Sequence, residues 1–299
     1  MNYLVIGSEG FIGSALVKFL IESGRVVERA DIQPLTLRHY TQLDPCAPDF
    51  EGLLVRHKVD VIVNCAGAAS VPDSLADPLR DFALNTHCVL QILEAMRKHA
   101  SEARFINLSS AAVYGNPRTL PIAASEPIRP VSPYGFHKRM SELACEEYHT
   151  VFDLQTVSLR IFSAYGPGLR KQLFWDLHQK ALAKHRPIEL FGTGRESRDF
   201  IYIQDLVRAI YLVAERHSMD GRSLNVGSGI ETSITEAVKS FLSLYEPMPE
   251  HRFLALSRKG DPLNWRADIT ELRDLGFSPD WSIRQGLGAY YQWLKGSDS

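Results

Sequence analysis

The chain has little cysteine and no excess of charge of either sign. Its 299 residues include four scattered cysteines with no C-x-x-C pair, namely Cys46, Cys65, Cys88 and Cys145. This pattern favours neither a disulfide framework nor a zinc site, so we expect reduced thiols and no bound metal. The 33 Lys and Arg residues nearly balance 35 Asp and Glu residues, giving a formal net charge of -2. Without a basic surplus, a nucleic acid partner is not expected.

The sequence also lacks a long apolar run. The first apolar run, residues 3–6, has no basic leader and ends at Gly7, unlike the core of a signal peptide. No later run approaches the roughly 20 apolar residues that a membrane helix needs. We therefore expect a soluble, cytoplasmic protein with no membrane partner. A content of 45% hydrophobic and 23% charged residues is ordinary for a globular protein and excludes intrinsic disorder.

Short apolar runs alternate with segments of helical periodicity in the first half of the chain. The runs are rich in β-branched residues and cover 3–6, 59–63, 105–108 and 156–159. Between them, apolar residues recur at helical spacing, as over 11–20 and 89–96. This order predicts buried parallel strands joined by helical crossovers. We expect an α/β fold built on a doubly wound parallel (Rossmann) sheet.

After Arg160 the alternation loosens. Turn clusters at 165–168, 191–194 and 225–229 separate amphipathic stretches at 206–214, 234–245 and 283–294. We expect a dinucleotide-binding domain over 1–162 and a smaller α/β substrate-binding domain over 163–299. Part of the second half, about 195–228, is expected to return to the first domain.

A glycine-rich segment directly follows the first predicted strand and opens the first predicted helix. Its spacing is G-x-x-G-x-x-G, with Gly7, Gly10 and Gly13, and differs from the usual G-x-G-x-x-G fingerprint. Such a turn lets the backbone, here including Phe11 and Ile12, approach a pyrophosphate, while the helix N-terminus supplies the positive end of a dipole. The alternative is that the glycines only allow tight packing of helix on strand.

Asp31 follows the next apolar run, where an acidic side chain would accept hydrogen bonds from an adenosine ribose diol. A carboxylate there repels a 2′-phosphate, which favours NAD over NADP. Arg29, two residues earlier, leaves that choice open. The alternative for Asp31 is an ordinary loop aspartate.

Three residues predict alcohol and ketone chemistry. Ser110 lies at the carboxyl end of a predicted strand, and Tyr134 and Lys138, four apart, share one face of a predicted helix. A phenol has a pKa of about 10, but an adjacent ammonium, helped by a nicotinamide cation, favours the phenolate. Tyr134 would then be an acid/base catalyst. Alone, Y-x-x-x-K is often a chance surface pair, and a nucleophilic Ser110 is disfavoured because no G-x-S-x-G surrounds it.

These residues resemble a known family, the extended short-chain dehydrogenase/reductases, and within it the nucleotide-sugar epimerases, dehydratases and reductases. The resemblance covers nearly the whole chain. Besides the residues above, it rests on NCAG at 64–67, SSAAVYG at 109–115, LRIF at 159–162, YGPG at 165–168 and RDFIY at 198–202.

The resemblance implies roles on both sides of the site. Ser110 would polarise the sugar hydroxyl or keto oxygen, Tyr134 would shuttle its proton, and Lys138 would hold the nicotinamide ribose and tune Tyr134. Further cofactor-binding residues would be Ala66, Gly67, Asn85 and, near the adenine, Asp44. Arg198 and Ser163 would bind the nucleotide diphosphate of the substrate, Ser163 standing where many epimerases carry Asn.

Two further features bear on the reaction. Ala111 and Ala112 stand where the 4,6-dehydratases resembled carry an Asp-Glu pair, so dehydratase activity is not expected. The loop at 169–175, LRKQLFW, is basic and aromatic and would stack on a base, grip a diphosphate or cover the core.

We therefore expect an NAD-dependent nucleotide-sugar 4-epimerase that acts by transient oxidation at C4. An NAD(P)H-dependent reductase of a nucleotide-linked 4-keto-6-deoxy sugar would need the same three residues. A non-catalytic nucleotide-binding regulator is the alternative from another class, although it would have no chemical need for Ser110, Tyr134 and Lys138. Members of the family commonly form homodimers through two helices of each subunit, here 78–99 and 134–151, whose apolar faces fit an intramolecular core equally well.

Overall fold

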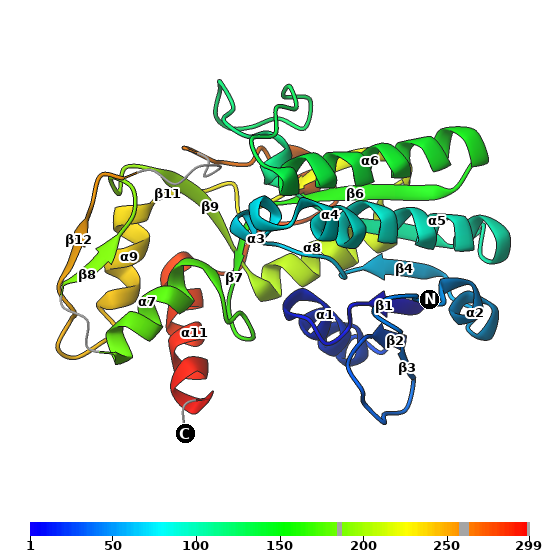
Figure 1. Cartoon of the computed structure of the whole chain (residues 1–299), viewed down its shortest axis with the longest axis horizontal. Helices are drawn as coiled ribbons and strands as arrows, with labels where there is room; N and C mark the ends of the chain where they lie inside the picture. Colours follow the sequence, from blue (N-terminus) through cyan, green and yellow to red (C-terminus); the bar gives the residue numbers. More distant parts are fainter. Residues whose placement is uncertain (184–186, 257–262, 298–299) are drawn as a thin grey trace.

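The structure is a computed structural model that describes residues 1–183, 187–256 and 263–297. Two groups of elements lie side by side along the long axis of the molecule (Figure 1). A seven-stranded sheet with its helices forms one end of the molecule. At the other end lie β8 (Ile188–Leu190), β12 (His251–Phe253), α7 (Gln172–Leu182), α9 (Ile234–Leu242) and α11 (Ile283–Ser297).

The main sheet is parallel throughout, in the order β10-β6-β5-β4-β1-β2-β3. Its strands are β1 Asn2–Ile6, β2 Val26–Asp31, β3 Tyr40–Gln42, β4 Val61–Asn64, β5 Arg104–Ser110, β6 Gln155–Ile161 and β10 Asp220–Val226. The strand order reverses between β1 and β4, which opens a crevice outside their carboxyl ends. The doubly wound sheet predicted from the sequence is confirmed, and β1, β4, β5 and β6 coincide with the predicted runs to within two residues.

Helices cover both faces of this sheet. Tyr3 and Val5 of β1 pack with α1 (Phe11–Glu22) and α8 (Ile203–Arg216). Leu4 and Ile6 point to the opposite face and pack with α2 (Phe50–Arg56), α5 (Cys88–His99) and α6 (Pro133–Phe152). Burial on both faces explains why the strand sequences are continuous apolar runs. Each buried aliphatic side chain contributes roughly 1.5–3 kcal/mol.

The predicted helix over 78–99 is a helical run with a change of pitch. It consists of α4 (Pro78–Phe82), a π-helical turn (η1, Ala83–His87) and α5, and it follows α3 (Val71–Ala76). Such turns are rare and occur frequently at functional sites. Asn85 lies in this turn, and α6 packs against α3, α4 and the turn.

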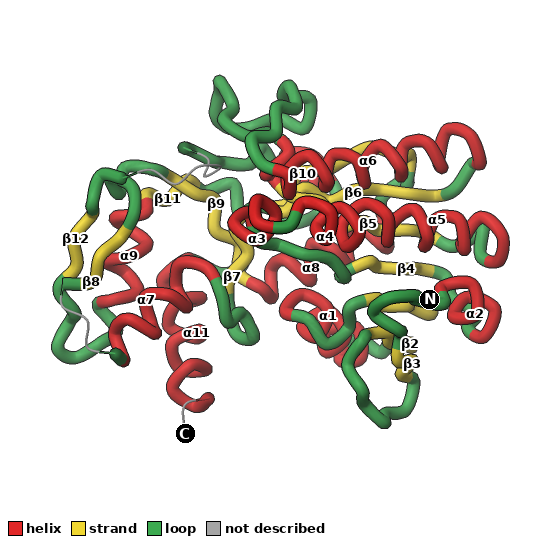
Figure 2. Tube along the Cα trace, in the orientation of Figure 1, coloured by secondary structure: helices red, strands yellow, loops and turns green. Residues whose placement is uncertain are grey.

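The second group holds the two small sheets and the helices α7, α9 and α11 (Figure 2). These elements are β7 Ser163–Tyr165, β9 Ser197–Tyr202 and β11 Glu231–Ser233; β8 Ile188–Leu190 and β12 His251–Phe253; and α7 Gln172–Leu182, α9 Ile234–Leu242 and α11 Ile283–Ser297. The short helix α10 (Thr270–Asp274) packs against β10 of the main sheet. After β9, α8 packs on α1 and β10 pairs with β6. The predicted domain boundary after residue 162 stays a prediction, and its second domain contains the stretches that the structure does not describe.

Candidate active site

The glycine-rich loop closes tightly over the end of β1. Gly7 has a positive φ of 77°, and a Cβ added to it would lie 2.6 Å from the backbone nitrogen of Ala66, which follows β4. A Cβ on Gly13 would collide with the carbonyl oxygen of Gly7. Only glycine fits at these positions, because the loop, the start of α1 and the loop after β4 approach one another through their backbones.

The N-terminus of α1 is open to an anion. Gly10 is its N-cap, and no side chain of the described residues caps it. The amides of Phe11, Ile12 and Gly13 lie in the first turn, where helix geometry supplies no intrahelical acceptor. The ring of Phe11 faces Gly168 in the turn after β7. A Cβ added to Gly168 would lie 3.4 Å from that ring. Amides free at a helix N-terminus suit a phosphate group, and their binding of the cofactor remains a prediction.

Asp31 lies at the end of β2 beside this loop, 8% exposed. Its Oδ2 accepts a hydrogen bond from the Glu9 amide at 2.9 Å and its Oδ1 accepts one from the Gln33 amide at 3.2 Å. Asp44 follows β3 on an exposed loop and accepts from the Cys46 amide at 2.7 Å. Asp31 thus lies next to the glycine-rich loop, and Asp44 follows the neighbouring strand β3. Their binding of the adenosine half of a cofactor remains a prediction.

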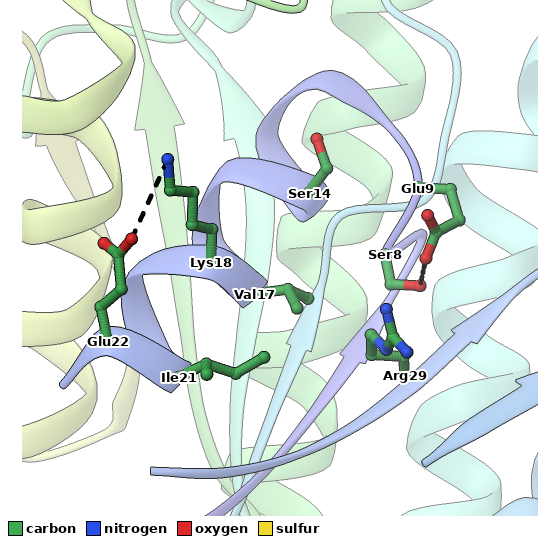
Figure 3. A pocket seen from close by; sticks show the side chains of 8 residues that line it. All are labelled: Ser8, Glu9, Ser14, Val17, Lys18, Ile21, Glu22 and Arg29. Carbon is green, nitrogen blue, oxygen red and sulfur yellow. Dashed lines mark hydrogen bonds and ion pairs between the residues drawn. The ribbon is translucent and has the colours of Figure 1, made fainter. Parts of the chain in front are cut away.

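Arg29 lines a small cavity on the outer side of the same loop (Figure 3). The cavity, about 340 Å³, lies between α1 and β2 and is also lined by Ser8, Glu9, Ser14 and Lys18, among others. Arg29 donates a hydrogen bond to the carbonyl of Arg38 at 3.1 Å, and its guanidinium lies 5.9 Å from the centroid of the Tyr40 ring. Arg29 is thus held on the same strand as Asp31, two residues from it.

Ser110, Tyr134 and Lys138 meet where β5 ends and α6 begins. Ser132 caps α6 by accepting from the Gly135 amide at 3.2 Å, which fixes the start of the helix. Lys138 Nζ donates to the carbonyl of Leu108 in β5 at 2.8 Å and lies 5.9 Å from the centroid of the Tyr134 ring. The three predicted catalytic residues are therefore brought together by the structure.

Burial controls the charge of these groups. It raises the pKa of Tyr134 to about 12; a hydrogen bond with Ser110 lowers that pKa and the charge of Asp81 raises it further. The protein's own groups thus favour the phenol form of Tyr134, and stabilisation of the phenolate by Lys138 together with a nicotinamide cation stays a prediction. Burial also lowers the pKa of Lys138 to about 8. Near neutral pH the pair is a phenol beside an ammonium.

The backbone after Ser110 carries no acid or base. Ala111 and Ala112 form a buried 3-10 turn (η2, Ala111–Val113), and Ser110 Oγ accepts from the Ala112 amide at 3.2 Å. Methyl side chains cannot transfer protons. This turn therefore offers no second proton-transfer pair of the kind that a 4,6-dehydratase would use.

Gly67 and Asn85 lie beside Lys138. Asn64 Oδ1 accepts from the Ala66 amide at 3.2 Å, which shapes the turn after β4. Gly67 has a φ of 135°, and a Cβ on it would be 2.8 Å from Asn85 Oδ1 and 3.5 Å from Lys138 Nζ. Asn85 Oδ1 is buried and accepts no hydrogen bond from the described residues. A buried free acceptor beside a glycine cradle fits a ligand with hydroxyl or amide donors.

A buried network of hydrogen bonds lies next to Ser110, on β5, β6 and α6. Arg160 donates to both carboxylate oxygens of Glu142 at 2.9 Å and to the Tyr114 hydroxyl at 2.8 Å. Ser109 donates to the same carboxylate at 2.7 Å, and Tyr114 donates to Asn225 Oδ1 at 2.7 Å. The network links β5, β6, β10 and α6 and joins the segments around Ser110 and Arg160 in space.

The substrate-side predictions fall in the small three-stranded sheet. Ser163 begins β7, opposite Phe200 of β9. Arg198 of β9 donates to the carbonyls of Ser197 at 2.8 Å and Leu263 at 3.2 Å, and its guanidinium lies 5.5 Å from the centroid of the Trp265 ring. The guanidinium of Arg198 is thus held by backbone carbonyls and an indole ring, while nucleotide binding by Arg198 and Ser163 remains a prediction.

The basic and aromatic loop over 169–175 is partly core. Leu169 and Phe174 are buried, and α7 begins at Gln172. Arg170 lies between two indoles, 5.6 Å from the Trp175 ring and 5.3 Å from the Trp293 ring. Of the three roles expected for this loop, the described contacts favour covering the core.

Sequence reasoning missed Asp81 and His137. His137 Nδ1 lies 2.6 Å from Asp81 Oδ2, and both side chains are buried. His137 precedes Lys138 in the chain, and Asp81 accepts a hydrogen bond from Asn85. The signal available was weak: a histidine adjoining Lys138 and an aspartate four residues before Asn85.

Two negative findings concern the described residues alone. Over 1–183, 187–256 and 263–297, no three His, Cys, Asp or Glu side chains are grouped as metal ligands. No helix in that part of the chain combines the length and apolarity needed to cross a membrane. All four cysteines are free.

Comparisons with known proteins agree with this geometry. A family model described as the NAD dependent epimerase/dehydratase family matches residues 3–227. The uncharacterized UDP-glucose epimerase YtcB of Bacillus subtilis is 31% identical over 96% of each chain. The UDP-glucose 4-epimerase of Mycolicibacterium smegmatis is 28% identical over 99% of each chain.

A solved structure is similar over the full length. The UDP-glucuronic acid 4-epimerase from Bacillus cereus, in complex with UDP-glucuronic acid and NAD, has a TM-score of 0.90 and 29% identity, covering 99% of this chain and 100% of that chain. With the family match over 3–227 and a relative above 30% identity, the chain belongs to the NAD dependent epimerase/dehydratase family.

Proposed function

We propose that the protein is an NAD-dependent nucleotide-sugar 4-epimerase, with a UDP-sugar as substrate. The observation that carries the proposal is the meeting of Ser110, Tyr134 and Lys138 at the carboxyl end of β5, beside the crevice at β1 and β4. Relatives of similar length are named as UDP-glucose and UDP-glucuronate 4-epimerases, which supports the substrate class.

The residues fit NAD. The open amides at the start of α1 suit a pyrophosphate, and Asp31 at the end of β2 suits a ribose diol. The buried Asn85 Oδ1 and Lys138 Nζ flank the space over Gly67, where donors and acceptors of a nicotinamide ribose would be satisfied. Ala66 would line the same turn, and Asp44 would lie toward the adenine. NAD supplies hydride acceptance and return at the sugar carbon.

The chain's own residues would handle the proton. Tyr134 would take the proton of the C4 hydroxyl and give it back, Ser110 would hold the oxygen by a hydrogen bond, and Lys138 would stabilise the phenolate with its positive charge. Because Tyr134 and Lys138 are both nearly buried, that charge would act in a low dielectric. Arg198 and Ser163 would contact the diphosphate of the nucleotide.

We also propose a homodimer formed through α4 and α6. Phe136, Met140 and Leu143 are exposed on one face of α6, and Leu79 of the neighbouring α4 is 82% exposed. Exposed apolar side chains on two adjacent helices would suit the same residues of a second copy about a two-fold axis. Sedimentation should show a dimer that Phe136→Lys converts to a monomer. The four free thiols support a cytoplasmic location.

One experiment tests the function. Protein purified without added cofactor is denatured, and any released nucleotide is identified by mass spectrometry. Turnover of the native protein is then followed on UDP-glucose, UDP-glucuronic acid and a nucleotide-linked 4-keto-6-deoxy sugar, with and without NADH. Retained NAD with inversion at C4 and no need for added cofactor is the expected result. Consumption of NADH with a 4-keto sugar alone would identify a reductase, and inertness on all substrates would favour a regulator.

A further inference from the structure

A buried carboxylate lies behind the candidate active site. Asp81 of α4 is 3% exposed, and both of its oxygens are engaged. Oδ2 lies 2.6 Å from His137 Nδ1, and Oδ1 accepts a hydrogen bond from Asn85 Nδ2 at 3.1 Å. Because a carboxylate only accepts, the imidazole hydrogen of this pair lies on Nδ1.

These contacts determine which way Asn85 faces. Asp81 holds Nδ2, so Oδ1 points the other way, toward Gly67, where it is buried and accepts from none of the described residues. A Cβ on Gly67 would be within 3.5 Å of both Asn85 Oδ1 and Lys138 Nζ. The carbonyl and the ammonium therefore face one small space.

The pair between Asp81 and His137 is itself held from two sides. The Phe82 ring packs edge-on against the His137 ring at 5.5 Å. Thr86, in the π-helical turn, donates from Oγ1 to the His137 carbonyl at 2.9 Å. Asp81 is thus fixed between α4, the turn and α6, and has little freedom to leave the site.

The charge of Asp81 also acts on the catalytic side chains. Burial lowers the pKa of Lys138, and Asp81 opposes this more than Cys88, Glu142 or Cys65, the other groups that face Lys138. Asp81 also raises the pKa of Tyr134. The Asp81 carboxylate therefore favours the protonated state of both Lys138 and Tyr134.

We propose that Asp81 is a positioning residue of the candidate active site: its two hydrogen bonds aim the Asn85 carbonyl at the space over Gly67 and hold a buried carboxylate against His137, the residue before Lys138. Asp81 acts through Asn85 and Lys138. The meaning of this arrangement for catalysis rests on the proposed function, whereas its effect on Lys138 does not.

The test removes the charge and keeps the shape. Asp81→Asn retains the size of the side chain and an acceptor for Asn85. The full-length protein is acetylated competitively at a series of pH values from neutral to alkaline. Mass spectrometry of the peptide that contains Lys138 then gives the titration midpoint of this side chain, and no turnover is needed. We expect the midpoint to fall by about one pH unit, the size of effect that a nearby opposite charge has. The alkaline limb of epimerase activity should fall with it.

Asp77→Asn is the matched control. Asp77 is an exposed residue that caps the same helix, and asparagine caps equally well, so one negative charge is lost without a change at Lys138. Its midpoint should equal that of the wild type. Asp81→Glu keeps the charge and should also titrate like the wild type.

The proposal would be overturned if Lys138 had the same titration midpoint in Asp81→Asn as in the wild type. It would also be overturned if Asp81→Glu displaced that midpoint as far as Asp81→Asn does. If Asp81→Asn does not fold, Asp81→Ser replaces it with the same expectation. Because acetylation needs no turnover, a folded wild type without epimerase activity would contradict the proposed function and leave this test intact.

Discussion

Lys138 Nζ and the carbonyl oxygen of Leu108 are joined by a hydrogen bond of 2.8 Å, which ties α6 to β5. The bond uses one of three ammonium donors and leaves two for a ligand. It also places the charge 5.9 Å from the centroid of the Tyr134 ring. Because a strand carbonyl holds Lys138, the Tyr134 hydroxyl can be removed without disturbing its neighbour.

Tyr134→Phe should therefore separate chemistry from folding. Loss of the hydroxyl removes the proposed acid/base, so kcat should fall by about 10²–10⁴-fold, while NAD retention and Tm stay near wild-type values. Tyr148→Phe is the control on the same helix, because its hydroxyl only bonds the partly exposed Glu94 at 3.3 Å. Steady-state kinetics on a UDP-sugar makes the measurement. Full activity in Tyr134→Phe would contradict the assignment.

The alkaline limb of activity should report Lys138. Burial lowers the pKa of this ammonium to about 8, so it is protonated below that pH and neutral above it. Since the positive charge is the proposed stabiliser of the Tyr134 phenolate, kcat/KM should decline as pH rises through about 8. A pH-rate profile measures this, with circular dichroism as the check that the fold persists. Activity that stays constant well above that pH would argue against the role of Lys138.

Local sequence patterns predict much of this molecule. Apolar runs identify β1, β4, β5 and β6 because strands buried on both faces must be apolar. The spacing of Tyr134 and Lys138 predicts one helix face, and both side chains do point into the same site. These features depend on neighbours within a few residues.

What the sequence could not predict depends on distant contacts. Asp81 contacts His137, 56 residues later, because the short helix α4 and the π-helical turn after it pack against α6. Arg170 packs against Trp293, far along the chain. The extent to which burial raises the pKa of Tyr134 could not be predicted for the same reason, because the depth of burial is a property of the assembled fold.

Gly13→Ala should damage the cofactor loop. The added methyl would collide with the Gly7 carbonyl, so the loop must shift, at a cost of about 1–3 kcal/mol. NAD retention should fall with it. Gly288→Ala in α11 is the control, since its Cβ would meet nothing within 4 Å and should stabilise the helix by about 0.5–1 kcal/mol. Chemical denaturation compares the two, and equal stability of both variants would contradict the collision.

Asp31→Asn should alter cofactor choice. The amide still accepts a hydrogen bond from the Glu9 amide but no longer repels a 2′-phosphate, and Arg29 lines the cavity beside it (Figure 3). The ratio of NAD to NADP affinity should therefore fall at least tenfold, since about 1.4 kcal/mol of lost discrimination gives that factor. Calorimetric titration with both cofactors measures the ratio. An unchanged ratio would place the ribose away from Asp31.

Arg160→Met should be strongly destabilising. Arg160 and Glu142 are both buried, and the guanidinium donates to both carboxylate oxygens at 2.9 Å. Methionine fills the space but leaves the Glu142 carboxylate with the Ser109 hydroxyl and the partly exposed Arg139, 3.1 Å away. Breaking a buried pair in this way costs about 3–5 kcal/mol. The free energy of unfolding in denaturant is the quantity to compare.

The exposed pair of Arg222 with Asp220 supplies the contrast. Its ions are 2.8 Å apart but solvated, so Arg222→Met should cost about 1 kcal/mol or less. The double variant Glu142→Gln with Arg160→Met should recover part of the loss, because no unpaired charge then remains buried. Glutamine can still accept the Ser109 hydrogen bond, which measures 2.7 Å to Glu142. If Arg160→Met proved no less stable than Arg222→Met, the network would be a passive contact, and the alignment of β5 with α6 beneath Ser110 would have to come from apolar packing alone.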